Sequence, residues 1–288
     1  MQKLEHILFP VDLSAACRSM APTVRSLACR TGAKVTLLNV LDMPPNYYSD
    51  PNAFLTLVDV TGLLREQRSK FELFLRPELD DLPKVTRISK HGDAARIIVD
   101  YAAKQNVDLI MMPTHGLGPF RRFLLGSVTA KVLHDSHCPV WTSDHDGEGN
   151  LPPSRVFQIL CAVDLTPDHV ATMRYADDFA RMFGAQLRFL HVVPAIPGFA
   201  ANYCDAEFVA GVSDAARQQL LQMQEKADST GEAVIRSGKL SKAVRNEAVE
   251  WNAGLIVIGR GVLQEPLGRL RSQTCSILRE SPCPVLSV

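Results

Sequence analysis

The sequence of 288 residues has no long apolar run, no surplus of charge of one sign and no closely spaced pair of cysteines. A helix needs about 20 consecutive apolar residues to cross a bilayer, so no association with a membrane is expected. Lys plus Arg and Asp plus Glu both total 31. Because non-specific binding to nucleic acid requires a basic surplus, no nucleic-acid partner is expected either.

Seven cysteines are scattered along the chain, and none belongs to a Cys-x-x-Cys motif. An odd number at such spacing argues against a disulfide framework and against a zinc finger. His134, His137 and Cys138 have a spacing that suits a metal on a helix. Cys138 precedes Pro139 at a helix-to-strand junction, so no metal site is predicted. The first residues, MQKLEHILFPVD, lack the features of a signal peptide, which predicts a reduced, cytoplasmic chain.

What the sequence does contain is an internal repeat. The segment Pro10-Val11-Asp12-Leu13-Ser14 is matched 152 residues later by Ala162-Val163-Asp164-Leu165-Thr166. Cys138-Pro139-Val140 returns 145 residues later as Cys283-Pro284-Val285. The polar segment between the repeats, rich in Gly and Pro, is typical of a linker. We therefore expect a first domain over 1–143, a linker over 144–153 and a second domain over 154–288.

Each half alternates between short apolar runs and stretches of helical periodicity. HILFPVD is typical of a strand buried on both faces. Ser14 is suited to cap the next helix and Gly32 to end it, and Thr166, Pro167 and Gly184 are expected to do the same in the second half. Alternating strands and helices predict an α/β fold with parallel sheets. The expectation is two tandem five-stranded parallel-sheet sandwiches.

Ligands of such sheets bind beyond the carboxyl ends of the strands, where the strand order reverses. The segment after the fourth predicted strand, Pro113 to Thr129, contains Gly126-Ser127 at the start of a predicted helix. Free N–H groups and the dipole at a helix N-terminus favour an anion, and the hydroxyls of Ser127 and Thr129 add donors. A loop of this composition is also consistent with a tight turn that merely caps a helix.

This arrangement resembles the universal stress protein family (UspA-like) over nearly the whole chain, twice, as in a tandem two-domain member. Nucleotide-binding members carry Gly-x-x-Gly, nine residues, and then Gly-Ser or Gly-Thr. Here Gly116, Gly126 and Ser127 fit, while Pro113 occupies the first glycine position. The resemblance implies a Rossmann-like fold of the adenine nucleotide alpha hydrolase type. It further implies ATP, with or without Mg²⁺, as ligand, unnamed protein partners, and an intramolecular pseudo-dimer or a homodimer.

The resemblance also implies the residues of the nucleotide site. Asp12 and Val40 would hold the adenosine, and Gly116, Gly126, Ser127 and Thr129 the phosphates. The complete expected set is Pro10, Val11, Asp12, Val40, Met112, Pro113, Gly116, Gly126, Ser127, Val128 and Thr129. Proline supplies no N–H, so any ligand contact made by the backbone amide at position 113 is lost.

The second half departs from the family pattern. Its candidate residues are Asp164, Val192, Gly259, Gly261, Arg271 and Ser272. Gly259 restores the first glycine, but Arg271-Ser272 stands where Gly-Ser is expected. A glycine at a helix entry usually marks close approach of the backbone to a ligand, so we expect Arg271 to obstruct this site. The second nucleotide motif is therefore predicted to be degenerate.

The resulting hypothesis is an ATP-binding stress-response regulator whose first domain holds the nucleotide. One alternative is an interaction scaffold that keeps the fold and binds no nucleotide. A slow ATPase or autophosphorylating protein that uses Ser127 or Thr129 is the least favoured alternative, because no general base is identifiable. Asp12 has no Ser-His pair or second carboxylate beside it, so no catalytic residue is predicted.

Overall fold

The computed structural model describes residues 3–41, 53–115, 125–143, 158–194, 206–260 and 269–288. The chain divides into two compact units, Lys3–Val140 and Trp141–Val288. The expected linker, 144–153, lies outside the described residues.

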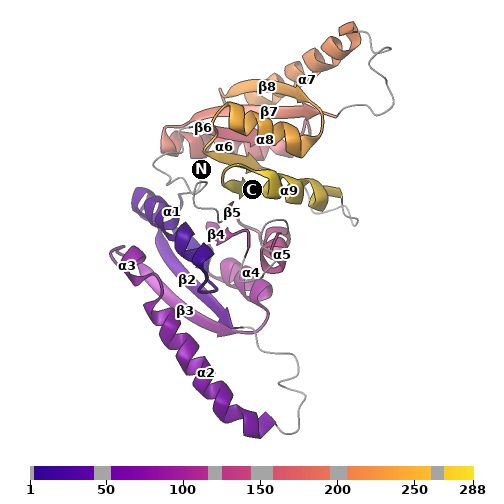
Figure 1. The fold of residues 1–288 in the computed structure, drawn as a ribbon. Coiled ribbons are helices and arrows are strands. Elements are labelled where there is room, and N and C mark those ends of the chain that lie inside the picture. The colour runs from indigo at the N-terminus through magenta and orange to yellow at the C-terminus, as the bar shows by residue number, and fades with distance from the viewer. Residues whose placement is uncertain (1–2, 42–52, 116–124, 144–157, 195–205, 261–268) are drawn as a thin grey trace. The chain divides into compact units, whose positions relative to one another are not determined.

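The first unit alternates strands and helices (Figure 1). Its elements are β1 (His6–Pro10), α1 (Ala15–Thr31), β2 (Lys34–Leu41), α2 (Ala53–Leu73), α3 (Arg76–Leu79), β3 (Val85–His91), α4 (Ala94–Lys104), β4 (Leu109–Pro113) and α5 (Ser127–Asp135). Every residue of β1 and β4 is buried, as the continuous apolar runs predict for strands covered on both faces. The short helix α3, which follows α2 directly, departs from the strict alternation of strands and helices.

The strand order of the first unit is β3-β2-β1-β4, and the pairs β3–β2, β2–β1 and β1–β4 are all parallel. Helix α1 packs against β1, β4 and α3, whereas α4 packs against β2 and α5 (Figure 1). The chain runs outward from β1 through β2 to β3 and then returns to place β4 on the other side of β1. The order therefore reverses between β1 and β4, and the ligand crevice of such sheets lies at their carboxyl ends.

The second unit repeats this plan. Strand β5 (Val140–Ser143) straddles the boundary between the units, and the remaining elements are β6 (Gln158–Ala162), α6 (His169–Phe183), β7 (Gln186–Val193), α7 (Ala206–Ala227), β8 (Glu232–Ser237), α8 (Leu240–Glu250), β9 (Leu255–Ile258), α9 (Arg269–Glu280) and β10 (Val285–Ser287). The order β10-β9-β6-β7-β8 is parallel in every described pair. The structure thus confirms the α/β fold with parallel strands and two repeats. How the two repeats pair stays a prediction.

The helix ends test the predicted caps. The Ser14 hydroxyl accepts a hydrogen bond from the Cys17 N–H at 3.3 Å, and Gly32 ends α1 in the left-handed conformation at φ 72°, so both predictions are confirmed. Gly184 likewise ends α6 at φ 62°. The predicted cap at Thr166 with Pro167 as first helical residue is wrong, because residues 166–168 form a turn and α6 begins at His169.

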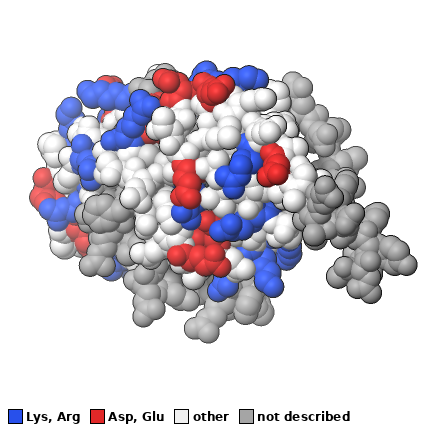
Figure 2. All heavy atoms as spheres, turned by 90° about the horizontal axis from the view of Figure 1, so that it is seen from above, with Lys and Arg blue, Asp and Glu red and all other residues white. Residues whose placement is uncertain are grey.

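The charge distribution agrees with the balanced composition. On the face drawn in Figure 2, basic and acidic side chains are interspersed over the described surface. None of the helices in the described part of the chain is long and apolar enough to span a membrane.

Candidate functional site

The exit of β1 is held by hydrogen bonds to the neighbouring strand. The Val11 N–H donates to the Leu38 carbonyl at 2.9 Å, and the Asn39 amide donates to the Val11 carbonyl at 2.8 Å. Beyond Val11, the backbone turns sharply, with Leu13 at φ 63°. This turn brings the half-buried Asp12 to the carboxyl edge of the sheet, between the end of β1 and the start of α1.

The Asp12 carboxylate organises the turn that leads into α1. Its Oδ1 accepts the Ser14 N–H at 3.0 Å and the Cys17 thiol at 3.2 Å. Burial, and secondly the nearby Asp12 charge, raise the pKa of Cys17 to about 12. The thiol therefore remains protonated at neutral pH and acts as a donor to Asp12. The second carboxylate oxygen, Oδ2, takes part in neither of these two hydrogen bonds.

The end of β4 is joined closely to the start of α5. The Gly126 N–H donates to the Thr114 carbonyl at 2.9 Å, and the Thr129 hydroxyl donates to the Pro113 carbonyl at 3.1 Å. A Cβ at position 126 would lie 3.2 Å from the Thr114 carbonyl oxygen, which is tighter than ordinary contact. Glycine at this position thus serves the packing of α5 onto β4 as well as any approach of a ligand.

The N-terminus of α5 carries no side-chain cap among the described residues, whereas Ser14 caps α1 and Asp93 caps α4. The first N–H groups of a helix have no acceptor within the helix. Ser127, the first residue of α5, is exposed, so the start of this helix is open to solvent. This is a helix terminus at which an anion would be favoured.

The structure places ten of the eleven predicted first-half residues. Pro10, Val11, Met112, Pro113 and Thr129 are buried, Asp12, Val40, Gly126 and Val128 are half-buried, and Ser127 is exposed. All ten lie at the ends of β1, β2 and β4 or at the start of α5. Gly116 lies outside the described residues. The buried Thr129 hydroxyl is already used within the protein, so Ser127 is the better hydroxyl donor of the two.

The corresponding edge of the second half is built differently. The position of Cys17 is taken by His169, whose Nδ1 accepts the Asp164 N–H at 2.9 Å. His191 takes the position of Asn39 and donates from Nδ1 to the Val163 carbonyl at 2.9 Å. Burial lowers the pKa of His169, and His191 lowers it further, while Asp164 and Asp168 act in the opposite direction. A neutral imidazole therefore stands where the first half has a thiol.

The remaining candidates of the second half follow β7 and β9. Val192 is buried in β7, and Gly259 follows β9. A Cβ at Gly259 would lie 2.9 Å from the Thr172 hydroxyl oxygen, so this glycine allows α6 to approach the sheet. Arg271 and Ser272 lie within α9, which begins at Arg269. Their side chains, and the whole of Gly261, lie outside the described part of the structure.

Three residues that bear on these sites had not been singled out from the sequence. They are Asn39, which ties β2 to the β1 exit, and His169 and His191 in the second half. Asn39 and His191 were detectable as polar side chains inside apolar strand runs. His169 had no comparable signal, because its role depends on where the N-terminus of α6 meets β6.

Together, the doubly wound parallel sheets and the helix N-terminus at the switch point define a Rossmann-like α/β protein. The chain belongs to the universal stress protein family: the family profile, described as "Universal stress protein family", matches residues 3–143 and again 156–288. This result confirms the resemblance and the tandem repeat.

Individual relatives support this assignment. The universal stress protein Sll1654 of Synechocystis sp. is 31% identical over 135 residues, which cover 46% of this chain and 82% of the relative. A universal stress protein structure from Archaeoglobus fulgidus DSM 4304 matches the fold with a TM-score of 0.69 at 23% identity, covering 100% of this chain and 98% of that one. Another from Archaeoglobus fulgidus, solved in complex with dAMP, is 20% identical and covers 46% of this chain and 96% of its own, with a TM-score of 0.35.

Proposed function

We propose that this protein is an ATP-binding stress-response regulator and that its first half holds the nucleotide. The observation that carries the proposal is the start of α5, which has no side-chain cap and lies at the switch point of the first sheet. Phosphate oxygens accept from the first-turn N–H groups of such a helix and are stabilised by its dipole. In this arrangement, Ser127 adds a hydroxyl donor at the same edge.

In this proposal, the nucleoside part of the ligand binds at the carboxyl ends of β1 and β2. Asp12 has one carboxylate oxygen engaged by Ser14 and Cys17, which orients the other oxygen toward a ribose hydroxyl. The apolar side chains of Val11 and Val40 supply contact surface for an adenine ring. A hydrogen bond to a charged carboxylate contributes about 1.5–3 kcal/mol, so Asp12 is expected to set much of the affinity.

Two features favour the first half over the second. Gly126 keeps the entry to α5 free of a side chain, whereas the family pattern in the second half places Arg271 near the corresponding position. In addition, the imidazole of His169 stands at the β6 exit where the first half has the smaller Cys17. Obstruction by Arg271 is therefore expected, and His169 already occupies the Asp164 N–H, so the second half should offer a nucleotide less room and fewer donors.

The proposal favours a regulatory role over efficient catalysis. Among the described residues of the first site, no general base stands beside Ser127, and the Asp12 carboxylate already accepts two hydrogen bonds. The proposal also includes Mg²⁺ as companion of the ATP phosphates and the cytoplasm as compartment. The six cysteines described are all free, which suits a reducing compartment.

The proposal is tested by calorimetric titration of ATP with Mg²⁺ into the full chain after removal of any bound nucleotide. We expect one site per chain. Asp12→Asn keeps an oxygen for Ser14 and Cys17 and removes only the charge, so it should fold normally and bind about tenfold more weakly or worse. Gly126→Arg copies the second half and should abolish binding.

Ala103→Arg is the matched control, because it adds the same charge at an exposed position on α4 away from the site. Urea unfolding of each variant separates a loss of binding from a loss of folding, which matters because a side chain at 126 crowds Thr114. Two sites in the wild type would refute the restriction to the first half. Absence of binding in the verified nucleotide-free protein would refute the function and leave the interaction scaffold.

A further inference from the structure

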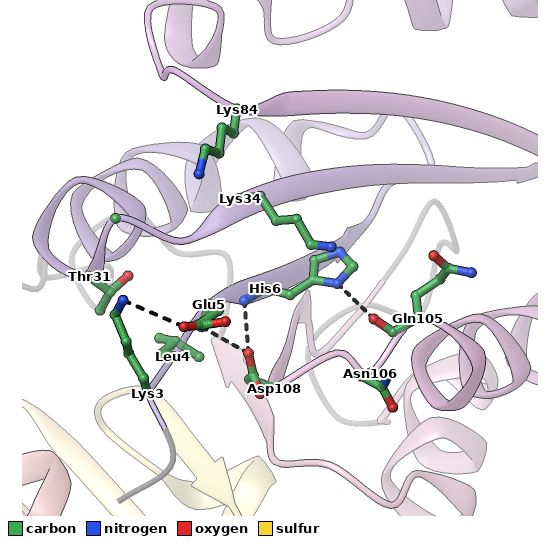
Figure 3. A pocket seen from close by; sticks show the side chains of 11 residues that line it. Lys3, Leu4, Glu5, His6, Thr31, Lys34, Lys84, Gln105, Asn106 and Asp108 are labelled. Atoms are coloured by element: carbon green, nitrogen blue, oxygen red, sulfur yellow. Dashed lines mark hydrogen bonds and ion pairs between the residues drawn. The ribbon is translucent and has the colours of Figure 1, made fainter.

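A hollow of about 510 Å³ lies at the opposite, amino edge of the first sheet (Figure 3). It is formed where β1, β2 and β3 begin and where α1 and α4 end. Its volume falls in the range of about 300–1,000 Å³ that holds small-molecule ligands. The hollow is separate from the proposed nucleotide site, because the two lie at opposite ends of the same parallel strands.

The strand register brings basic side chains together on this edge. His6 pairs with Lys34 between β1 and β2, and Val35 pairs with Val85 between β2 and β3. The residue before each valine is a lysine, so Lys34 and Lys84 are neighbours, and the Val35 N–H donates to the Lys84 carbonyl at 2.9 Å. Adjacent strands are about 4.8 Å apart, so two exposed lysines start from neighbouring backbone positions at the rim of the hollow, and their ammonium groups lie at separate places along it (Figure 3).

The acidic groups of the hollow are engaged elsewhere. Glu5 pairs with Lys3 at 3.5 Å. The Asp108 carboxylate accepts the N–H groups of Glu5 and His6 at 2.8 and 2.9 Å (Figure 3). Within the part of the chain that the structure describes, neither Lys34 nor Lys84 forms an ion pair. Lys34 and Lys84, both exposed, therefore line the hollow without a carboxylate partner among the described residues.

His6 does not add to this charge at neutral pH. Burial lowers its pKa, and the neighbouring Lys34 lowers it further. Its Nε2 lies 2.9 Å from the Thr36 hydroxyl and its Nδ1 lies 3.3 Å from the Gln105 carbonyl oxygen. The neutral, buried His6 ring thus lines the hollow without adding charge, and the lysines supply the positive charge.

The second half provides an internal comparison for the role of the lysines. Lysines near helix C-termini offset the helix dipole, and α1 and α4 both end at this edge. The equivalent helices α6 and α8 end in the same way, with Gly184 again left-handed. By the same register, however, Gln186 and Thr230 stand where the first half has Lys34 and Lys84. The fold of a repeat therefore does not require this pair of cations.

We propose that the hollow binds the phosphate group of a small phosphorylated molecule, with Lys34 and Lys84 as its cationic contacts. A phosphate monoester carries close to two negative charges at neutral pH and offers three acceptor oxygens, so it can accept from the flexible side chains of two lysines on adjacent strands. The hollow is larger than a phosphate ion alone. The side chains of Thr31, Gln105 and Asn106 line the rest of it and supply hydrogen-bonding groups for a polar body.

The experiment is an amide NMR titration of the full chain with inorganic phosphate and with glycerol 3-phosphate, at constant ionic strength maintained with chloride. We expect saturable shifts at the amides around residues 31–34, 84 and 105–108. Lys34→Gln with Lys84→Thr copies the second half and should weaken binding about tenfold or more. Lys226→Gln with Lys242→Gln removes the same charge at exposed positions on α7 and α8 of the second unit and should leave the dissociation constant unchanged.

Urea midpoints establish that both double variants are folded. Glycerol, which lacks the phosphate, should cause no shifts. The proposal is overturned if neither anion gives saturable shifts at this edge, or if shifts occur only around residues 126–129, the proposed nucleotide site. Equal weakening in both double variants would also overturn it, because only the net charge of the protein would then matter. None of these outcomes depends on whether ATP binds.

Discussion

The most demanding consequence of the structure concerns Glu247, a carboxylate buried in the second unit. Only 1% of its side chain is exposed, and it lies between two arginines: Arg188 Nη1 at 2.7 Å from Oε1 and Arg236 Nε at 2.7 Å from Oε2. The Arg188 guanidinium also stacks over the Trp251 ring at 4.3 Å and pairs with Glu232 at 2.6 Å. Replacing Glu247 by Gln keeps the volume and removes the charge that both arginines face.

The expected loss follows from burial. Removing one partner of a buried ion pair typically costs about 3–5 kcal/mol, because the remaining charge is left desolvated. Arg188 keeps Glu232, and Arg236 is 47% exposed and can turn to water. Glu247→Gln is therefore expected to lower the free energy of unfolding by about 3 kcal/mol, at the lower end of this range. With a urea dependence of about 2 kcal/mol per molar, the unfolding midpoint should fall by about 1.5 M.

The assay is urea unfolding of the full chain followed by tryptophan fluorescence. Both tryptophans, Trp141 and Trp251, lie in Trp141–Val288, so the signal reports this unit. Glu232→Gln is the control: Glu232 touches the same Arg188 but is 59% exposed, and its loss should cost about 1 kcal/mol or less. Equal midpoint changes in the two variants, or a change below about 0.5 kcal/mol for Glu247→Gln, would refute the assignment of a desolvated charge cluster.

Two further predictions concern packing and pH. Gly259→Ala should lower the free energy of unfolding of the second unit by about 1–3 kcal/mol, because the added Cβ would lie 2.9 Å from the Thr172 hydroxyl oxygen. Gly211→Ala is the control and should not destabilise the unit, because the space around Gly211 is open. Urea midpoints in the opposite order would contradict this packing argument. The pKa of His6 is lowered in the folded state, so the unfolded chain binds more protons at low pH and stability must fall as pH decreases below about 6.5. His6→Gln should flatten this decline between pH 6.5 and 5 in circular dichroism unfolding curves of the first unit, and an unchanged slope would rule out His6 as its source.

Much of the fold follows from local sequence patterns. The apolar runs predict strands: HILFPVD was expected to be a strand buried on both faces, and β1 spans His6–Pro10 with every residue buried. Ser14 and Gly32 delimit α1 as predicted, because capping depends on neighbouring backbone groups only. Thr166 failed as a cap because a turn forms at residues 166–168 and the buried His169 takes the Asp164 N–H. That contact joins the ends of two elements, and no local pattern reports it.

For the candidate site too, some features follow from local sequence and others only from the tertiary structure. The sequence motif at Gly126-Ser127 correctly predicts a helix start, since α5 begins at Ser127. Its position beside the β1 exit depends on the strand order β3-β2-β1-β4, which the alternation of strands and helices alone leaves open. The close approach of Gly126 to Thr114 likewise appears only when β4 and α5 are placed in three dimensions.

By itself, the sequence determined that the chain is a tandem repeat of α/β halves, because periodicity, caps and repeated motifs are properties of contiguous residues. Only the tertiary structure decided how each half fills equivalent positions. Where the second half has Arg188, Arg236 and Glu247, the first has Thr36, Lys90 and Tyr101, with Thr36 near His6 and Lys90 over the Tyr101 ring at 5.4 Å. The same holds for Lys34 beside Lys84 at the amino edge. The physical reason is register: parallel strands joined through helices bring together residues far apart in sequence, and a shift of one residue would turn each side chain to the other face.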